Sequence, residues 1–206
     1  MLFRSNSTAA NFLPVAQFPT VAHIDLLHHK LIPDPYIDDN EIKCLWVNDA
    51  DWTYRTTALP QINLLSPGVH ADLVFDGLDT VVDVYLNDKH ILSSKNMHVQ
   101  HRVDVTELLR QAKGQSSLEL RFKAAPAFSR EEKERIGYKG NETDVHFGGP
   151  ERLFLRKAQY HWVRIPIDSE HTSSLRSAGA NIFAGLGLGA GGQHLRSMEA
   201  NLSGNF

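Results

Sequence analysis

Short β-type runs separated by turn residues recur about every ten residues through most of this 206-residue sequence, and no other feature restricts its fold as strongly. Trp52–Thr57 is rich in aromatic and β-branched residues, and Ala71–Asp76 ends at a glycine. Leu118–Phe122 alternates strictly between apolar and polar side chains. Many short strands at this spacing are typical of two packed antiparallel sheets. The sequence therefore predicts an all-β antiparallel sandwich with little helix.

Three local patterns add detail to this prediction. Thr80–Leu86 and Lys89–Leu92 flank Asn87-Asp88, and both turn residues tolerate positive φ, so we expect a hairpin with a primed turn. Asp104 stands where it can accept the first amides of a single helical turn that contains Leu108-Leu109. Only Phe128–Ile136 has the composition of a longer helix.

The pattern changes twice along the chain and divides it into three segments. Residues 1–12 form a polar leader without periodicity, and residues 13–162 carry the strand pattern. Residues 163–206 include the run Gly185–Gly192, which offers little side-chain bulk to bury. We expect this last segment to be an irregular, low-complexity tail that is disordered.

Composition excludes several classes of function. The net charge is −3, from 21 basic and 24 acidic residues, which argues against nucleic acid or an anionic membrane as a partner. The single cysteine, Cys44, rules out an internal disulfide and a thiolate zinc site. No apolar run reaches the roughly 18 residues that span a bilayer, and no secretory signal is evident, so we expect a cytoplasmic location.

Neither a metal nor a cofactor site is predicted. His98 and His101 are three residues apart and would point to opposite faces of a strand, and His28 and His29 are adjacent, a poor geometry for one ion. No glycine-rich motif stands between a strand and a helix, as a nucleotide site requires. Trp46, Trp52 and Tyr54 could line a sugar platform, but their strand spacing favours a place in the core.

A series of short motifs runs in a fixed order between Leu13 and Trp162, about three quarters of the chain. The motifs are Leu13–Val15, Pro19-Thr20, His23–Leu27, Ile32–Tyr36, Asn40-Glu41, Trp46-Val47, Asp51–Thr56, Phe75–Thr80, Val84–Asn87, Asp104–Thr106 and Arg156–Trp162. Together they resemble the N-terminal sequence of β-mannosidases of glycoside hydrolase family 2, and the residues of the motifs are most similar to those of the fungal intracellular type.

This resemblance implies a jelly-roll β-sandwich of the galactose-binding-like kind. In the family, this domain stands beside an immunoglobulin-like domain and a (β/α)₈ barrel, and the whole enzyme removes terminal β-mannose from oligosaccharides with retention. Two barrel glutamates perform the chemistry, and a barrel of about 250 residues cannot fit in this chain. Asn40-Glu41 and Asn141-Glu142 reproduce the Asn-Glu dipeptide of the acid/base residue, but neither follows a barrel strand, so we expect turn residues there. No catalytic residue is predicted, and the chain alone should be inactive.

The resemblance stops abruptly after Trp162. The family continues with Gly-Trp-Asp-Trp-Gly-Pro, whereas this sequence continues with Val163–Ile167 and then a glycine-rich segment. We expect such a change where a gene has been truncated or its reading frame has shifted. Losing the family's following strand should leave a long unpaired sheet edge through which copies associate. Two alternatives remain open: a free-standing carbohydrate-binding module without catalysis, and a fragment without function.

Overall fold

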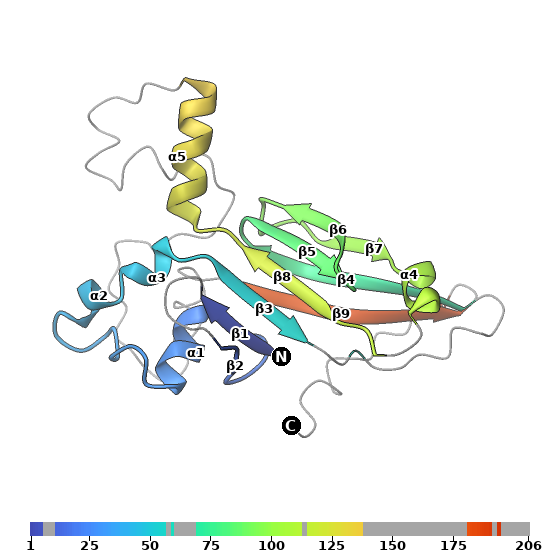
Figure 1. Cartoon of the computed structure of the whole chain (residues 1–206), viewed down its shortest axis with the longest axis horizontal. Coiled ribbons are helices and arrows are strands. Elements are labelled where there is room, and N and C mark those ends of the chain that lie inside the picture. Colours follow the sequence, from blue (N-terminus) through green and yellow to red (C-terminus); the bar gives the residue numbers. More distant parts are fainter. Residues whose placement is uncertain are drawn as a thin grey trace.

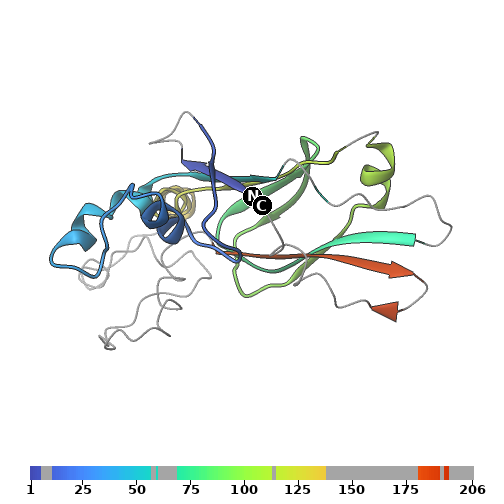
Figure 2. The same ribbon diagram turned by 90° about the horizontal axis from the view of Figure 1, so that it is seen from below.

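Two antiparallel sheets form the body of the protein, and the short helices α1 (Ala22–His28), α2 (Asn40–Lys43) and α3 (Trp46–Asp49) lie at one end of them (Figure 1). The computed structural model describes residues 1–5, 11–56, 59, 69–112, 115–137, 181–190 and 193–194. Within these residues the strands pair only antiparallel, which confirms the predicted all-β antiparallel architecture. Figure 2 shows the two sheets as separate layers.

The larger sheet has six strands in the order β2-β1-β3-β8-β5-β6. Their bounds are β1 (Leu2–Ser5), β2 (Leu13–Pro14), β3 (Trp52–Thr56), β5 (Val82–Leu86), β6 (Lys89–Ser94) and β8 (Leu118–Phe122). Apolar alternation orients β8, on which Leu118, Leu120 and Phe122 are buried and Arg121 is exposed. Glu119 between them is also buried, at 8% exposed, although it lies on the other face of the strand.

The smaller sheet has four strands in the order β10-β9-β4-β7. Their bounds are β4 (Val69–Asp79), β7 (His101–Asp104), β9 (Asn181–Ala190) and β10 (Gln193–His194). β4 is the long central strand, with a register shift between Phe75 and Gly77 where it pairs with β9. It turns the buried side chains of Ala71, Leu73 and Phe75 toward the larger sheet.

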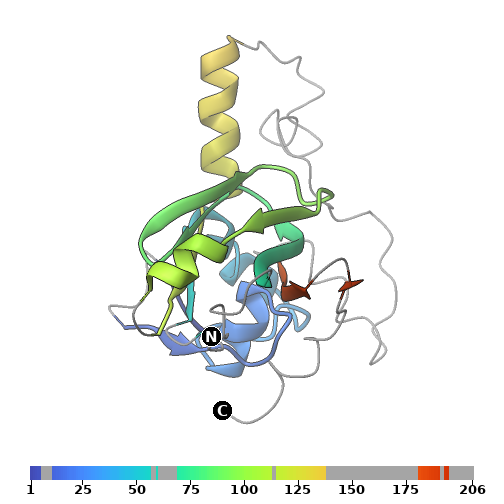
Figure 3. The ribbon, with the colours of Figure 1, turned by 90° about the vertical axis from the view of Figure 1, so that its right-hand side faces the viewer.

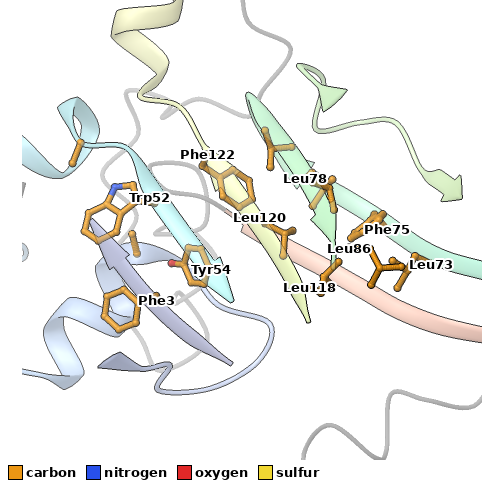
Figure 4. Packing of buried hydrophobic residues seen from close by; sticks show 14 of the residues in the cluster. Phe3, Trp52, Tyr54, Leu73, Phe75, Leu78, Leu86, Leu118, Leu120 and Phe122 are labelled. Atoms are coloured by element: carbon orange, nitrogen blue, oxygen red, sulfur yellow. The ribbon is translucent and has the colours of Figure 1, made fainter. Parts of the chain in front are cut away.

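The core lies between the two sheets (Figure 4). Leu120 and Phe122 of β8 point toward the same interior as Phe75 and Leu73 of β4, and Phe3 extends the cluster at the far edge. Trp52 and Tyr54 are 4% and 0% exposed, which confirms that they belong to the core and do not form a sugar platform. Trp46 is half-buried, with its ring centroid 6.1 Å from that of Trp52.

Two predicted turns are confirmed. Asn87 and Asp88 have φ of 50° and 62°, the left-handed pair that a type I′ turn requires between β5 and β6. The backbone N–H of Thr106 donates to Asp104 Oδ1 at 2.8 Å, so Asp104 helps to start α4 (Thr106–Gln111) as predicted.

The longer helix predicted at Phe128–Ile136 is also confirmed. It is α5 (Ala125–Ile136), which begins earlier because Pro126 is well suited to a first turn, and it ends at Gly137 with φ 71°. Figure 3 shows α5 projecting away from the sheets. The sequence analysis did not predict the other three helices, α1 (Ala22–His28), α2 (Asn40–Lys43) and α3 (Trp46–Asp49), which are each at most seven residues long.

The expected leader is wrong for its first residues. Leu2–Ser5 forms β1 between β2 and β3, and Phe3 is only 1% exposed. A four-residue strand is too short to show periodicity, so its neighbours decide its conformation.

The described part of the expected tail also differs from the prediction. Asn181–Ala190 forms β9, which pairs with β4 and places Leu186 opposite Leu73 and Leu188 opposite Ala71. Glycine weakens strands, so the sequence alone argued against one here, but β4 supplies a long ladder for its backbone. The boundary expected near Trp162 lies outside the described residues and stays a prediction.

Candidate functional site

Asp25 on α1 is the most deeply buried carboxylate in the described part of the chain, at 0% exposed. The backbone N–H of Ala16 donates to its Oδ1 at 2.7 Å, and the Tyr54 hydroxyl donates to its Oδ2 at 3.3 Å. Burial raises the pKa of Asp25 above its usual value, although the hydrogen bonds from Ala16, Thr20 and Tyr54 oppose this shift.

A raised pKa is one property of a general acid, but Asp25 lacks the second property, which is access to the substrate. A glycosidase acid must reach the glycosidic oxygen of the substrate, and a retaining enzyme places a second carboxyl roughly 5–5.5 Å away. Asp25 is sealed behind α1 and β3, with no exposed surface. Its position therefore supports a structural role: it connects the segment that contains Ala16 to α1 and to β3.

Charged side chains cross the outer face of the six-stranded sheet. Glu119 on β8 accepts hydrogen bonds from Arg55 Nε on β3 at 2.7 Å and from Arg121 Nε at 2.6 Å. Burial tends to raise the pKa of Glu119, but the hydrogen bonds and charges of the two arginines outweigh it and lower the pKa. The hydrogen bond that Arg121 donates to Glu119 also raises the pKa of Arg121. Glu119 is therefore held as a carboxylate and is poorly suited to donate a proton.

Aromatic rings extend this row of charges in both directions. The Cζ atom of Arg121 lies 4.1 Å from the ring centroid of Tyr85 on β5. On the other side, Arg55 and Arg4 lie 4.9 Å and 4.6 Å from the ring centroid of Phe12. These are cation–π distances, and the row from Arg4 to Tyr85 offers hydrogen-bond donors, ring faces and one carboxylate, Glu119, whereas a retaining glycosidase uses a pair of carboxyl groups. We call Arg4, Phe12, Arg55, Glu119, Arg121 and Tyr85 the arginine row.

The β5–β6 hairpin gathers a serine, a histidine and an aspartate, the three residue types of a hydrolase triad. Ser93 Oγ donates to Asp83 Oδ1 at 2.5 Å, and His90 Nε2 lies 2.9 Å from Ser93 Oγ and 3.5 Å from Asp83 Oδ1. In a working triad the imidazole stands between the other two groups and uses one ring nitrogen for each. Here the same nitrogen faces both groups, and the serine proton is directed at the carboxylate. The cluster is a surface hydrogen-bond network and cannot activate Ser93.

The histidines considered for a metal are separated. His101 Nε2 lies 3.0 Å from Ser94 Oγ, whereas His98 precedes β7 and its backbone N–H donates to Asn96. His28 and His29 have ring centroids 5.1 Å apart, but His29 Nε2 lies 2.7 Å from the carbonyl oxygen of Pro14. Over the residues that the structure describes, no group of three or more His, Cys, Asp or Glu side chains could hold a metal ion.

Only one of the two Asn-Glu dipeptides lies among the residues that the structure describes. Asn40-Glu41 was expected to be turn residues and instead begins α2, a single helical turn, and Asn40 Nδ2 donates to the carbonyl oxygen of Asp34 at 3.0 Å. Asn141-Glu142 lies outside the described residues. The pairing of Arg55, Glu119 and Arg121 was not predicted from the sequence. Alternation could have placed each on an outer face, but only the register brings Arg55 opposite Glu119.

None of the helices among the described residues is long and apolar enough to cross a membrane. The two packed antiparallel sheets define the class of this protein as a β-sandwich domain. Comparison with known proteins identifies the family.

The sequence model of the family "Glycosyl hydrolase 2 galactose-binding domain-like" matches residues 3–164, and the chain belongs to this family. A β-mannosidase B of Thermothelomyces thermophilus is 46% identical over 154 residues, covering 74% of this chain and 17% of that protein. A β-mannosidase B of Aspergillus oryzae is 44% identical over 151 residues, covering 73% and 17%. The chain thus spans less than a fifth of the curated relatives that it matches.

A solved structure agrees with this assignment. The crystal structure of a β-D-mannosidase from Dictyoglomus thermophilum superimposes with a TM-score of 0.66 at 31% identity, over 77% of this chain and 18% of that one. The resemblance stated from the motifs is confirmed, and so is the galactose-binding-like fold. The domain is of the β-mannosidase type.

Proposed function

We propose that this chain supplies the galactose-binding-like domain of a β-mannosidase, an enzyme that releases terminal β-mannose from oligosaccharides, and that it does not catalyse the reaction itself. The identity of 46% over 154 residues to a β-mannosidase B carries the proposal. The geometry agrees with the non-catalytic part of it, because Asp25 is sealed in the core and Glu119 is held between two arginines.

An activity assay tests this proposal. The purified chain should hydrolyse no aryl β-mannoside above background, while the full-length T. thermophilus enzyme serves as the positive control. The assay should be repeated on the Asp25→Asn and Glu119→Gln variants. Turnover that follows the protein through purification and disappears in either variant would contradict the non-catalytic assignment.

A second candidate is a free-standing carbohydrate-binding module, and β9 favours it. A module that functions alone needs a sheet completed by its own chain, and β9 lies alongside β4 from Val69 to Asp79. Isothermal titration with β-1,4-mannobiose separates the two candidates. Saturable binding that weakens at least about tenfold in Arg121→Ala would favour the module, because Arg121 offers exposed donors beside the Tyr85 ring.

We also propose self-association through a sheet edge and a cytoplasmic location. β9 pairs with β10 only at Gly189 and Ala190, so within the described residues its other eight positions have no strand on that side. Open edges of this kind favour pairing with another copy. The free, buried Cys44 supports a reducing compartment. Size-exclusion chromatography and fractionation of cells that express the tagged chain are the tests.

A further inference from the structure

Six large apolar side chains are exposed on one short stretch of the chain, which runs from the last turn of α1 to the residue before α3. They have exposed fractions of 36% to 63%, and we call them the apolar patch: Leu27, Leu31, Tyr36, Ile37, Ile42 and Leu45. Among the described residues, only two further large apolar side chains, Val99 and Ile136, are exposed to this degree. These six residues fall within nineteen consecutive positions, and large exposed apolar surfaces usually mark a site that another surface covers.

A fixed framework holds the apolar patch. Leu26, Ile32, Cys44 and Val47 lie between or beside the patch residues in sequence, and all four are buried in the core. The backbone N–H of Leu31 donates to the carbonyl oxygen of Leu26 at 2.9 Å, and Trp52 Nε1 donates to that of Val47 at 3.0 Å. The patch is therefore presented by an anchored segment, so little ordering would be needed on binding.

Among the residues that the structure describes, no strand of either sheet covers the segment that carries the patch. Figures 1 and 2 show α1, α2 and α3 together at one end of the two sheets, with α2 farthest from them. A partner can meet this end without displacing a strand of either sheet.

The charges around the patch indicate the chemistry of the partner. Four acidic residues stand between positions 27 and 45 against two lysines, and Lys43 is already bonded to Asp39 at 3.0 Å. Asp38 and Glu41 are exposed beside Ile37 and Ile42. Two copies of this surface would bring like charges together, which disfavours a symmetric pair. The complementary surface is apolar at its centre and carries lysine or arginine at its rim.

We propose that the apolar patch is the surface on which the remaining part of a β-mannosidase packs, and this inference rests on the proposed function. The matched region covers 17% of the T. thermophilus relative, so in such a protein most of the chain lies outside this domain. Interfaces between domains of one chain bury roughly 600–1,500 Å². The anchored apolar patch and its acidic rim supply one half of such an interface.

A hybrid enzyme tests the proposal. Residues 3–164 of this chain replace the matched segment in full-length T. thermophilus β-mannosidase B, and the isolated 206-residue chain is studied in parallel. The test variant is Ile37→Lys with Ile42→Lys. The matched control is Ile136→Lys, because Ile136 is 53% exposed and Ile37 is 54% exposed. Hydrogen exchange and thermal unfolding are measured for both proteins.

We expect amides in residues 27–45 to exchange at least about tenfold more slowly in the hybrid than in the isolated chain. The test variant should remove this protection and lower the unfolding temperature of the hybrid, while the control variant does neither. In the isolated chain both variants should leave the unfolding temperature unchanged, because their side chains already face solvent.

Several results would overturn the inference, and they separate it from the proposed function. Equal exchange in the two proteins, or equal behaviour of test and control variants, rejects the patch as the docking surface even if the hybrid is active. A folded hybrid that protects residues 27–45 but hydrolyses no mannoside supports the patch and contradicts the proposed function. A hybrid that does not fold contradicts both.

Discussion

The Tyr54 hydroxyl donates to the Asp25 carboxylate across 3.3 Å, and this bond joins β3 to α1 inside the core. Both residues are 0% exposed, so neither group can exchange its partner for bulk water. Burial raises the pKa of Tyr54, and the neighbouring carboxylate raises it further. The phenol therefore stays protonated at neutral pH and remains a hydrogen-bond donor.

Tyr54→Phe should destabilise the domain by about 1–3 kcal/mol, because it leaves a buried carboxylate with one hydrogen bond fewer. Asp25→Asn should cost less, since it removes the buried charge while keeping an oxygen that can accept from Ala16. Urea unfolding of both single variants and the double variant measures the coupling between the two side chains. Additive effects would show that the bond contributes nothing of its own.

The pH dependence of stability should differ in sign between Asp25 and Glu119. The folded-state pKa of Asp25 is raised above 3.8, so its contribution grows more favourable as pH falls through that folded pKa. The folded-state pKa of Glu119 is lowered below 4.5, so its contribution is present above 4.5 and is lost as pH falls through the folded value. Relative to the wild type, Asp25→Asn should therefore become less stable on acidification from pH 7 to pH 4. The difference should stop growing near pH 4, because the unfolded-state carboxyl also takes up its proton there. Unfolding curves at several pH values test this, with Glu119→Gln as the variant of opposite trend.

Breaking the centre of the arginine row should have a modest cost. Glu119→Gln at pH 7 should destabilise the domain by about 1 kcal/mol, because the arginines are partly exposed and solvent screens them. The control is Glu132→Gln on α5, whose partner Arg135 is exposed at the helix end, and we expect no measurable change there. A similar loss in both variants would argue that Glu119 is an ordinary surface charge.

The type I′ turn makes a prediction about backbone conformation. Asp88 has φ of 62°, so Asp88→Gly should be neutral or slightly stabilising, and Asp88→Val should cost about 1–2 kcal/mol. Thermal unfolding of the two variants decides this. A harmless valine would mean that the left-handed conformation is not required at this position.

Strand β9 predicts slow amide exchange in the glycine-rich run. Its pairing with β4 should protect alternate amides between Asn181 and Ala190. Hydrogen exchange followed by mass spectrometry is the measurement, with the amides of β8 as a protected reference. Exchange in this run at the rate of an unfolded peptide would restore the expectation of an irregular tail.

The sequence by itself determined those features that depend on neighbouring residues. The alternation of Leu118–Phe122, the Asn87-Asp88 turn, the hydrogen bond from the Thr106 amide to Asp104 and the helix near Phe128 are all local, and each is present in the structure. The ordered motifs determined the family in the same way, because the identity of short segments requires no knowledge of how they pack.

Only the tertiary structure decided the features that depend on distant partners. Phe3 is buried because β3 pairs with β1, and the buried Asp25 carboxylate accepts a hydrogen bond from Tyr54, 29 residues away. β9 exists because β4 offers a ladder to a segment of low strand propensity. Pairing and burial across such separations are set by the register and layers of the whole fold, and no local pattern of side chains encodes them.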